Sequence, residues 1–230
     1  MRAIRVKTGW MSAEATAAPP AGQRRPTEIV VGTGEPGIVV VAWRAYPVTE
    51  GPTGHVDAAA AILPVGSNRP RAAVSLGEGD LIGYPRGPIV ATVDAEGRPV
   101  VAWTVPARPG MSVPTARVAS QAGVWGPPQV LDSSGSLGSL VREGAGVAVG
   151  WLRETPGGEG HGNPLGVFVA RMQNGDLFGP AELVDDASAG TMFDGLQPPG
   201  LGPSVTGGLL AVYADHGPNG VGGSARVSSR

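Results

Sequence analysis

The sequence contains no cysteine, which excludes disulfide bonds, thiolate metal sites and a cysteine nucleophile. Lysine is almost absent as well, because Lys7 stands alone beside sixteen arginines. Charged residues make up only 16% of the chain, and the formal net charge is -2. No basic stripe is present that could neutralise a phosphate backbone, so we expect no nucleic-acid partner.

Long hydrophobic runs are also missing. The run at 58–65 is among the longest, and it is far below the roughly 18 residues that a membrane-spanning helix needs. The start of the chain, residues 1–7, is basic, but the apolar stretch of a signal peptide does not follow it. The sequence therefore predicts neither a signal peptide nor a transmembrane segment, and no membrane partner. It leaves the localisation of the protein open.

What the chain does contain is an apolar phrase that recurs four times and ends in an aromatic residue. The four final residues are Trp43, Trp103, Trp151 and Tyr213, separated by 60, 48 and 62 residues. Such a period matches units of four short strands, as in the blades of a β-propeller. The 38 glycines and 23 prolines fall mainly between the apolar runs, where a strand-rich fold needs turns.

The apolar phrase is continuous instead of alternating, so both faces of this strand are expected to be buried. A blade between two neighbouring blades meets that condition better than a sheet of a sandwich does. We predict a single all-β domain, a propeller of about four blades of four antiparallel strands. The predicted units are a partial blade at 1–20, full blades at 21–76, 77–132 and 133–185, and a partial blade at 186–230.

The repeats place the third strand of a unit at both ends of the given sequence. Two arrangements of the blades are then possible. Either the chain closes a four-bladed ring with 12–17 as the missing outer strand, or it is an incomplete part of a larger propeller, which is the interpretation we favour. An incomplete ring exposes the apolar faces of its outer blades, which favours association into a homodimer.

A second phrase, a glycine-aromatic turn after the third strand, carries a family resemblance. Ser120, Gly123 and Trp125 form one copy, and Gly175 and Phe178 a more degenerate one. Together with the strand that ends in tryptophan, these turns resemble the sialidase-like propeller superfamily with its Asp-box, or bacterial neuraminidase, repeats. The resemblance implies a fold and not an activity. The arginine triad, the tyrosine nucleophile with its glutamate, and the aspartate acid/base of sialidases are not recognisable in this sequence.

Because strands alternate in direction, the short turns are expected on one side of the propeller and the longer loops on the other. Ligand-binding candidates are the polar residues in or beside these longer loops: Arg44, His55, Arg153, Glu154, His161, Asp215 and His216. The histidines follow their strand aromatics at unequal spacings, so we predict no metal site, and the sequence suggests no cofactor. No carboxylate pair has a spacing that fixes its geometry, so the sequence assigns no catalytic residue.

These features predict a non-catalytic module that binds a glycan or a protein through its loop-rich side. The alternative is an exo-glycosidase of sialidase type, or a fragment of one, that hydrolyses terminal sugars. The recurring aromatic residues are expected to pack between blades instead of forming a platform for sugars.

Overall fold

A computed structural model describes the backbone of residues 3–6, 9–12, 24–35, 37–47, 55–80, 87–108, 111–155, 164–172, 175–186, 192–193, 198–204, 208–216 and 223–229. Side chains are described for residues 28–35, 37–45, 57–77, 87–107, 112–155, 165–172, 175–185, 198–204 and 208–213. The described secondary structure is entirely β. Within the described part, no helix is long and apolar enough to cross a membrane.

Four four-stranded antiparallel sheets follow one another along the chain. The first contains β3 (Arg24–Gly34), β4 (Ile38–Pro47), β5 (His55–Leu63) and β6 (Val74–Asp80). The second contains β7 (Val90–Val93), β8 (Pro99–Arg108), β9 (Met111–Val118) and β10 (Gln129–Val130). The third contains β11 (Ser136–Glu143), β12 (Gly146–Glu154), β13 (Pro164–Met172) and β14 (Glu182–Asp186). The fourth contains β15 (Met192–Phe193), β16 (Gly200–Pro203), β17 (Leu209–His216) and β18 (Gly223–Ser229), and a separate hairpin contains β1 (Ala3–Val6) and β2 (Gly9–Ser12).

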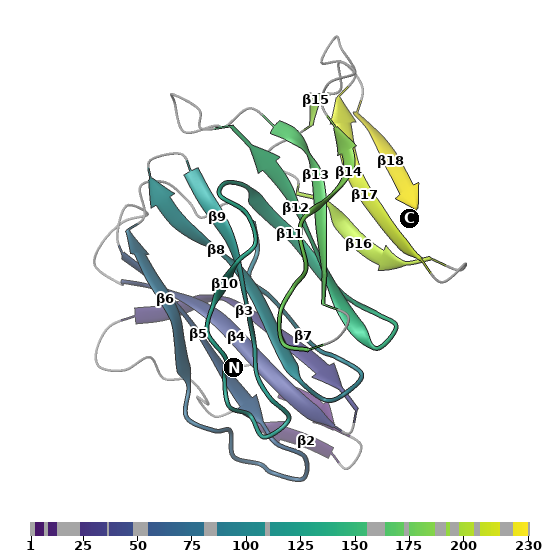
Figure 1. Ribbon diagram of the computed structural model, residues 1–230. Helices are drawn as coiled ribbons and strands as arrows, with labels where there is room; N and C mark the ends of the chain where they lie inside the picture. The colour runs from purple at the N-terminus through teal and green to yellow at the C-terminus, as the bar shows by residue number, and fades with distance from the viewer. Residues whose placement is uncertain are drawn as a thin grey trace.

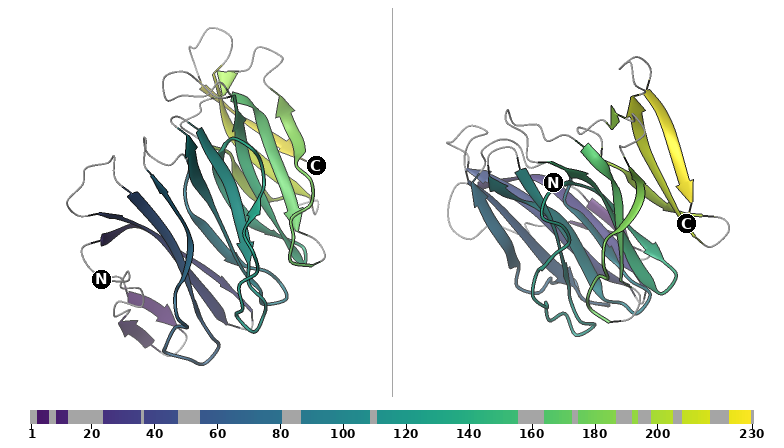
Figure 2. Two further views of the ribbon diagram at one scale, coloured as in Figure 1. Left: turned by 60° about the vertical axis from the view of Figure 1, so that its left-hand side comes forward. Right: turned by 45° about the horizontal axis from the view of Figure 1, so that its top comes forward.

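The first three sheets are simple meanders, in which each strand pairs with the next one in the sequence. All four sheets stand side by side in one row, with the first and the fourth at its two ends (Figures 1 and 2). The first strands of the first three sheets, β3, β7 and β11, and β16 of the fourth sheet contact one another in succession. This is the arrangement of blades in a β-propeller, here an open arc, and it confirms the predicted fold class. The boundaries given above for the individual units stay a prediction.

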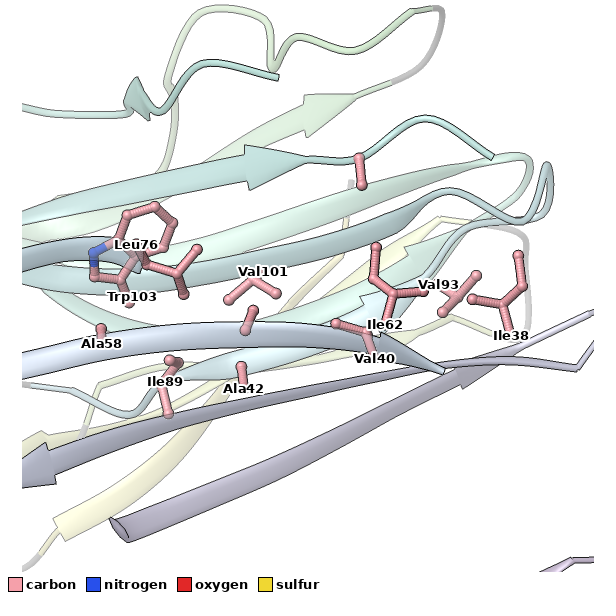
Figure 3. Close-up of a cluster of buried hydrophobic side chains, with 12 residues drawn as sticks. Ile38, Val40, Ala42, Ala58, Ile62, Leu76, Ile89, Val93, Val101 and Trp103 are labelled. Atoms are coloured by element: carbon pink, nitrogen blue, oxygen red, sulfur yellow. The ribbon is translucent and has the colours of Figure 1, made fainter. Parts of the chain in front are cut away.

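The hydrophobic core lies between the sheets. Small and branched side chains of β4, such as Val40 and Ala42, meet Val101 and Trp103 of β8, as Figure 3 shows. The next layer of core repeats this pattern, because Val100 and the other face of β8 pack against the third sheet. The central strand β8 therefore buries both of its faces, which is why its sequence is continuously apolar.

The recurring aromatic residues fill these layers. Trp103 lies in the core between the first and second sheets, and Trp151 in the core between the second and third. Tyr213 packs with Leu152 and Val167 of the third sheet. Each of these three side chains faces the preceding sheet and is almost fully buried, which confirms that they pack between blades.

Glycine lets the first strands of neighbouring sheets approach closely. A Cβ on Gly32 of β3 would lie 2.6 Å from backbone atoms of Ala91 and Thr92 in β7. A Cβ on Gly138 of β11 would lie 2.1 Å from the carbonyl oxygen of Pro199, just before β16. No side chain fits in either place, so the backbones themselves form the contact along this inner row.

Two elements differ from what the repeats predict. The repeats predict the first strand of the fourth unit at 203–206, of which 205–206 lie outside the described residues; the described strand here is β16, Gly200–Pro203, and Ser204 N donates to Gly208 O. The repeats also predict a loop at 104–113, but the structure has a hairpin there whose pairing continues to Arg108 and Met111. Backbone pairing does not need apolar side chains, so strands continue beyond the runs that identify them in the sequence.

Candidate functional site

The site was expected at the end of the propeller where the second strand of each sheet leads into the third. Six of the seven candidates lie within strands, whereas the sequence placed them in or beside the longer loops. The side chains of His55, Asp215 and His216 lie outside the described residues, and so does the whole of His161. Arg44, Arg153 and Glu154 can be placed, and they lie in three different environments.

Arg153 belongs to a cluster built around Asp132, a residue in the connection between the second and third sheets. The Asp132 carboxylate accepts a hydrogen bond of 2.8 Å from the indole Nε1 of Trp151 and one of 2.6 Å from Nε of Arg153. Its other oxygen accepts the backbone N–H of Ser133 at 2.7 Å. Both carboxylate oxygens are thus engaged by protein donors, and the side chain is largely buried.

The Arg153 guanidinium also lies over an aromatic ring. Its Cζ is 3.7 Å from the centroid of Phe168, in a cation–π contact. Phe168 in turn stacks with Trp151, with ring centroids 6.2 Å apart. The carboxylate, guanidinium and two rings therefore form one packed unit at the end of β12.

The carboxylate-aromatic contact occurs a second time, one sheet further along. The phenol of Tyr213 in β17 donates a hydrogen bond to Asp185 in β14. Asp132 and Asp185 each follow the start of the fourth strand of a sheet by three residues, and Trp151 and Tyr213 occupy the same place in the repeat. The contact is thus a recurring clasp between neighbouring sheets.

Glu154 follows Arg153 directly but contacts different groups. Its Oε1 accepts a hydrogen bond of 2.8 Å from Ser136 Oγ, and its carbonyl oxygen accepts one from Ser134 Oγ at 2.5 Å. The glutamate is buried. Its neighbours are serines at the start of β11, so the sequence-adjacent pair of Arg153 and Glu154 does not form a joint site.

Arg44 lies at the boundary of the first and second sheets. Its Nη1 donates to Glu28 Oε2 at 2.9 Å and to the carbonyl oxygen of Gly87 at 2.9 Å. The second oxygen of Glu28 accepts the N–H of Ile89 at 2.6 Å. The arginine is buried, and among the residues that the structure describes its Nη2 finds no hydrogen-bond partner. The pair ties the first sheet to the chain that enters β7.

The opposite end of the propeller carries polar contacts of the same kind. Asp94 in the turn before β8 accepts hydrogen bonds from the backbone N–H and the Nε of Arg98. Nη1 of Arg98 reaches Asp176 in the third sheet at 3.1 Å. Burial alone would lower the pKa of Arg98, but the hydrogen bond and charge of Asp94, with Glu96 and Asp176, raise it above the ordinary value.

An arginine recurs in the third strand of the units, as Arg117, Arg171 and Arg226, and this repetition predicts a solvent-facing or inter-blade ladder. Arg171 pairs with Glu143 and Glu182 on either side of it in its own sheet. Arg117 donates to the carbonyl oxygen of Ser75 in the first sheet, and burial lowers its pKa. One arginine thus bridges two sheets and the other braces a single sheet, while the side chain of Arg226 lies outside the described residues.

The sequence reasoning missed the two carboxylates that organise this end, Asp132 and Glu28. A signal for the first was present, because Asp132 and Asp185 recur at the same distance from the start of their strands. Glu28 has no counterpart of its kind in the other units. Over the side chains that the structure describes, no three histidine, aspartate or glutamate residues are grouped so as to hold a metal ion.

No protein-family model matches the chain, and no curated protein matches it either. Among solved structures it is similar to a xylan β-1,4-xylosidase from Bacillus halodurans, with 13% identity and a TM-score of 0.46 over 96% of this chain and 45% of the xylosidase. It is also similar to an exo-1,5-α-L-arabinanase from a bovine ruminal metagenomic library, with 10% identity and a TM-score of 0.44 over 87% of this chain and 73% of the enzyme. An α-L-arabinanase of Penicillium chrysogenum gives 8% identity and a TM-score of 0.43 over 91% and 67% of the two chains.

These structural neighbours are named as enzymes that act on glycans, and the chain spans less than half of the xylosidase. The likenesses are too distant to transfer an activity to this protein.

Proposed function

We propose that this protein is a non-catalytic propeller module that binds a glycan or a protein through the end where second strands lead into third strands. The proposal is supported mainly by the hydrogen bonds that the charged side chains at this end make within the protein. Glu28, Asp132 and Glu154 each accept hydrogen bonds from neighbouring protein groups. These carboxylates hold the sheets in place.

Glycoside hydrolysis by two carboxylates needs an acid and a base or nucleophile that both face the substrate. Asp132 has both oxygens engaged by Trp151, Arg153 and Ser133, so it has no proton-transfer role while this cluster is intact. Glu154 lies buried beside Ser136. The contacts of Asp132 and Glu154 therefore support a structural assignment for these two carboxylates.

The exposed apolar residues at the two ends provide a way to locate the binding surface. Leu165, at the start of β13 on the proposed binding end, is 45% exposed. Leu177, in the turn at the opposite end, is 63% exposed. Exposed leucines contribute apolar contact area to a partner, and neither one is part of the core. The pair thus gives a matched test, with one residue at each end.

The experiment is a binding screen of the purified chain on an array of glycans, with capture of proteins from cell extract as the second arm. Hydrolysis of aryl sialosides, xylosides and arabinosides is measured in parallel. We expect a ligand in one arm, no turnover, and loss of binding in Leu165→Glu but not in Leu177→Glu. Turnover of any of the three substrates contradicts the non-catalytic assignment. Equal loss of binding in both variants, or loss only in Leu177→Glu, contradicts the assigned end.

A further inference from the structure

We propose that the two outer faces of the row of sheets are unfinished blade-to-blade interfaces, and that they bind each other head to tail in a second copy of this chain. One is the β3 part of the outer face of the first sheet, where Ile29 and Val31 are exposed. The other is the outer face of the fourth sheet, formed by Gly200, Gly202 and Val212. We call them the first-sheet face and the fourth-sheet face.

The first-sheet face carries residues that the other sheets bury. Ile29 lies directly across from Trp43 in the strand ladder, just as Leu137 lies across from Trp151. Leu137 is completely buried against the preceding sheet, whereas Ile29 is 50% exposed. Val31, two residues along on the same side of the strand, is 45% exposed. The β3 position is therefore open where its counterpart in the third sheet is covered, while Trp43 beside it is only 2% exposed, so the open part of this face is the part formed by β3.

The fourth-sheet face offers the complementary feature, a glycine strand with open space over it. Along the inner row, the glycines of one strand receive the backbone of the next sheet, as Gly32 receives Ala91 and Thr92. Gly202 of β16 pairs with Leu210 and shares the outward side of its sheet, yet a Cβ placed there meets nothing within 4 Å. Gly200 pairs in the same way with Val212, which is 44% exposed. This surface has the form of an inner-row contact that none of the described strands occupies.

The chain itself shows which surface fits each vacancy. At the boundary of the first and second sheets, a forward face with Val40 and Ala42 packs against a backward face with Ile89 and Trp103. At the boundary of the second and third sheets the same two kinds of face meet again. The first-sheet face is a backward face and the fourth-sheet face is a forward face. The first-sheet face of one copy therefore fits the fourth-sheet face of a second copy, which gives a heterologous contact.

The first-sheet face does not fit its own copy equally well. Two backward faces would bring Ile29 and Val31 against another Ile29 and Val31, with no glycine strand to receive them. Exposed apolar surface of this kind drives association in water. The contact between two copies is therefore head to tail, which distinguishes it from a symmetric contact of identical faces.

The experiment measures the mass of the 230-residue chain and of single variants by light scattering after gel filtration. Ile29→Glu blocks the first-sheet face, and Val212→Glu or Gly202→Leu blocks the fourth-sheet face. Val124→Glu, at another exposed valine, serves as the control. All four positions are at least partly open to solvent, and circular dichroism with thermal unfolding confirms that each variant folds.

We expect the unmodified chain and Val124→Glu to associate, and each blocked variant to run at the 23.1 kDa of one chain. An equimolar mixture of Ile29→Glu and Val212→Glu should regain the mass of two chains, because each variant keeps the face that the other lacks. A monomeric unmodified chain overturns the proposal. Association that survives in Val212→Glu and in Gly202→Leu also overturns it, because it shows a contact that does not involve the fourth-sheet face.

Discussion

Asp132 and Trp151 are joined by a hydrogen bond of 2.8 Å, from the indole Nε1 to the carboxylate, at the boundary between the second and third sheets. The same relationship joins Asp185 to Tyr213 at the next boundary. A propeller has no strand pairing between its blades, so such side-chain contacts and the apolar layers carry the cohesion of the row.

Removing the Asp132 carboxylate should weaken the boundary between the second and third sheets. Asp132→Ala leaves the buried Trp151 indole and the half-buried Arg153 without their acceptor, and we expect a loss of about 2–4 kcal/mol in the free energy of unfolding. Asp132→Asn keeps an acceptor for the indole and should lose about half of that. Equilibrium urea unfolding followed by tryptophan fluorescence measures both, and equal stability of the two variants would contradict the role assigned to the clasp.

The inner row should not tolerate a methyl group at Gly138. Gly138→Ala brings a Cβ within 2.1 Å of the Pro199 carbonyl oxygen, so the strands must separate, and overpacking of this kind costs roughly 1–3 kcal/mol. Gly202→Ala is the matched control, because its Cβ meets nothing within 4 Å. Thermal unfolding of dilute samples compares the two. A melting temperature of Gly138→Ala equal to that of Gly202→Ala would show that the close approach is absent.

The Arg44–Glu28 pair gives a third prediction. Arg44→Ala removes the partner of a half-buried carboxylate and empties a buried position, so we expect a loss of about 3–5 kcal/mol. Glu28→Gln keeps an acceptor for the Ile89 N–H and removes only the charge, and should cost clearly less. Urea unfolding measures the difference. If Glu28→Gln is the more damaging of the two, the pair does not act as described.

Gln129 gives a fourth prediction, because its amide exchanges two hydrogen bonds with the backbone of Phe178 in the third sheet. Nε2 donates to the Phe178 carbonyl at 2.7 Å, and Oε1 accepts the Phe178 N–H at 2.8 Å. Gln129→Ala should lower the free energy of unfolding by about 1–2 kcal/mol. Gln129→Glu should cost more, since a carboxylate loses the donor and faces a carbonyl oxygen. The order of the two midpoints in urea is the readout, and the reverse order would contradict this contact.

Much of the fold could be predicted from the sequence, because the repeated segments consist of apolar residues. The phrases that end in Trp43, Trp103, Trp151 and Tyr213 each lie in a central strand of a sheet, and in the first three sheets a turn with a positive-φ glycine precedes the phrase as expected. The fourth sheet was placed less well. The strand β16, Gly200–Pro203, has one leucine and no alternating pattern, so nothing in its composition marks it as a strand.

The candidate site was harder to predict, because its residues are defined by contacts across sheets. Arg44, Arg153 and Glu154 were selected as loop residues available to a ligand, yet each one contacts a neighbouring protein group from within a strand. Asp132 was not selected, although its spacing repeats at Asp185. Sequence position shows which residues stand near one end of the propeller, but only the packing of two sheets shows which carboxylate meets which donor.

The most direct test of the whole account is the mass of the unmodified chain in solution, measured by light scattering over a wide range of concentration. An open row of four blades with unfinished faces at both ends predicts that the mass rises with concentration from the 23.1 kDa of one chain to that of two chains or more, because a head-to-tail contact leaves a further face free until a ring closes. A mass that stays at 23.1 kDa at every concentration would contradict it, because the faces around Ile29 and Val212 would then be stable in water without a partner.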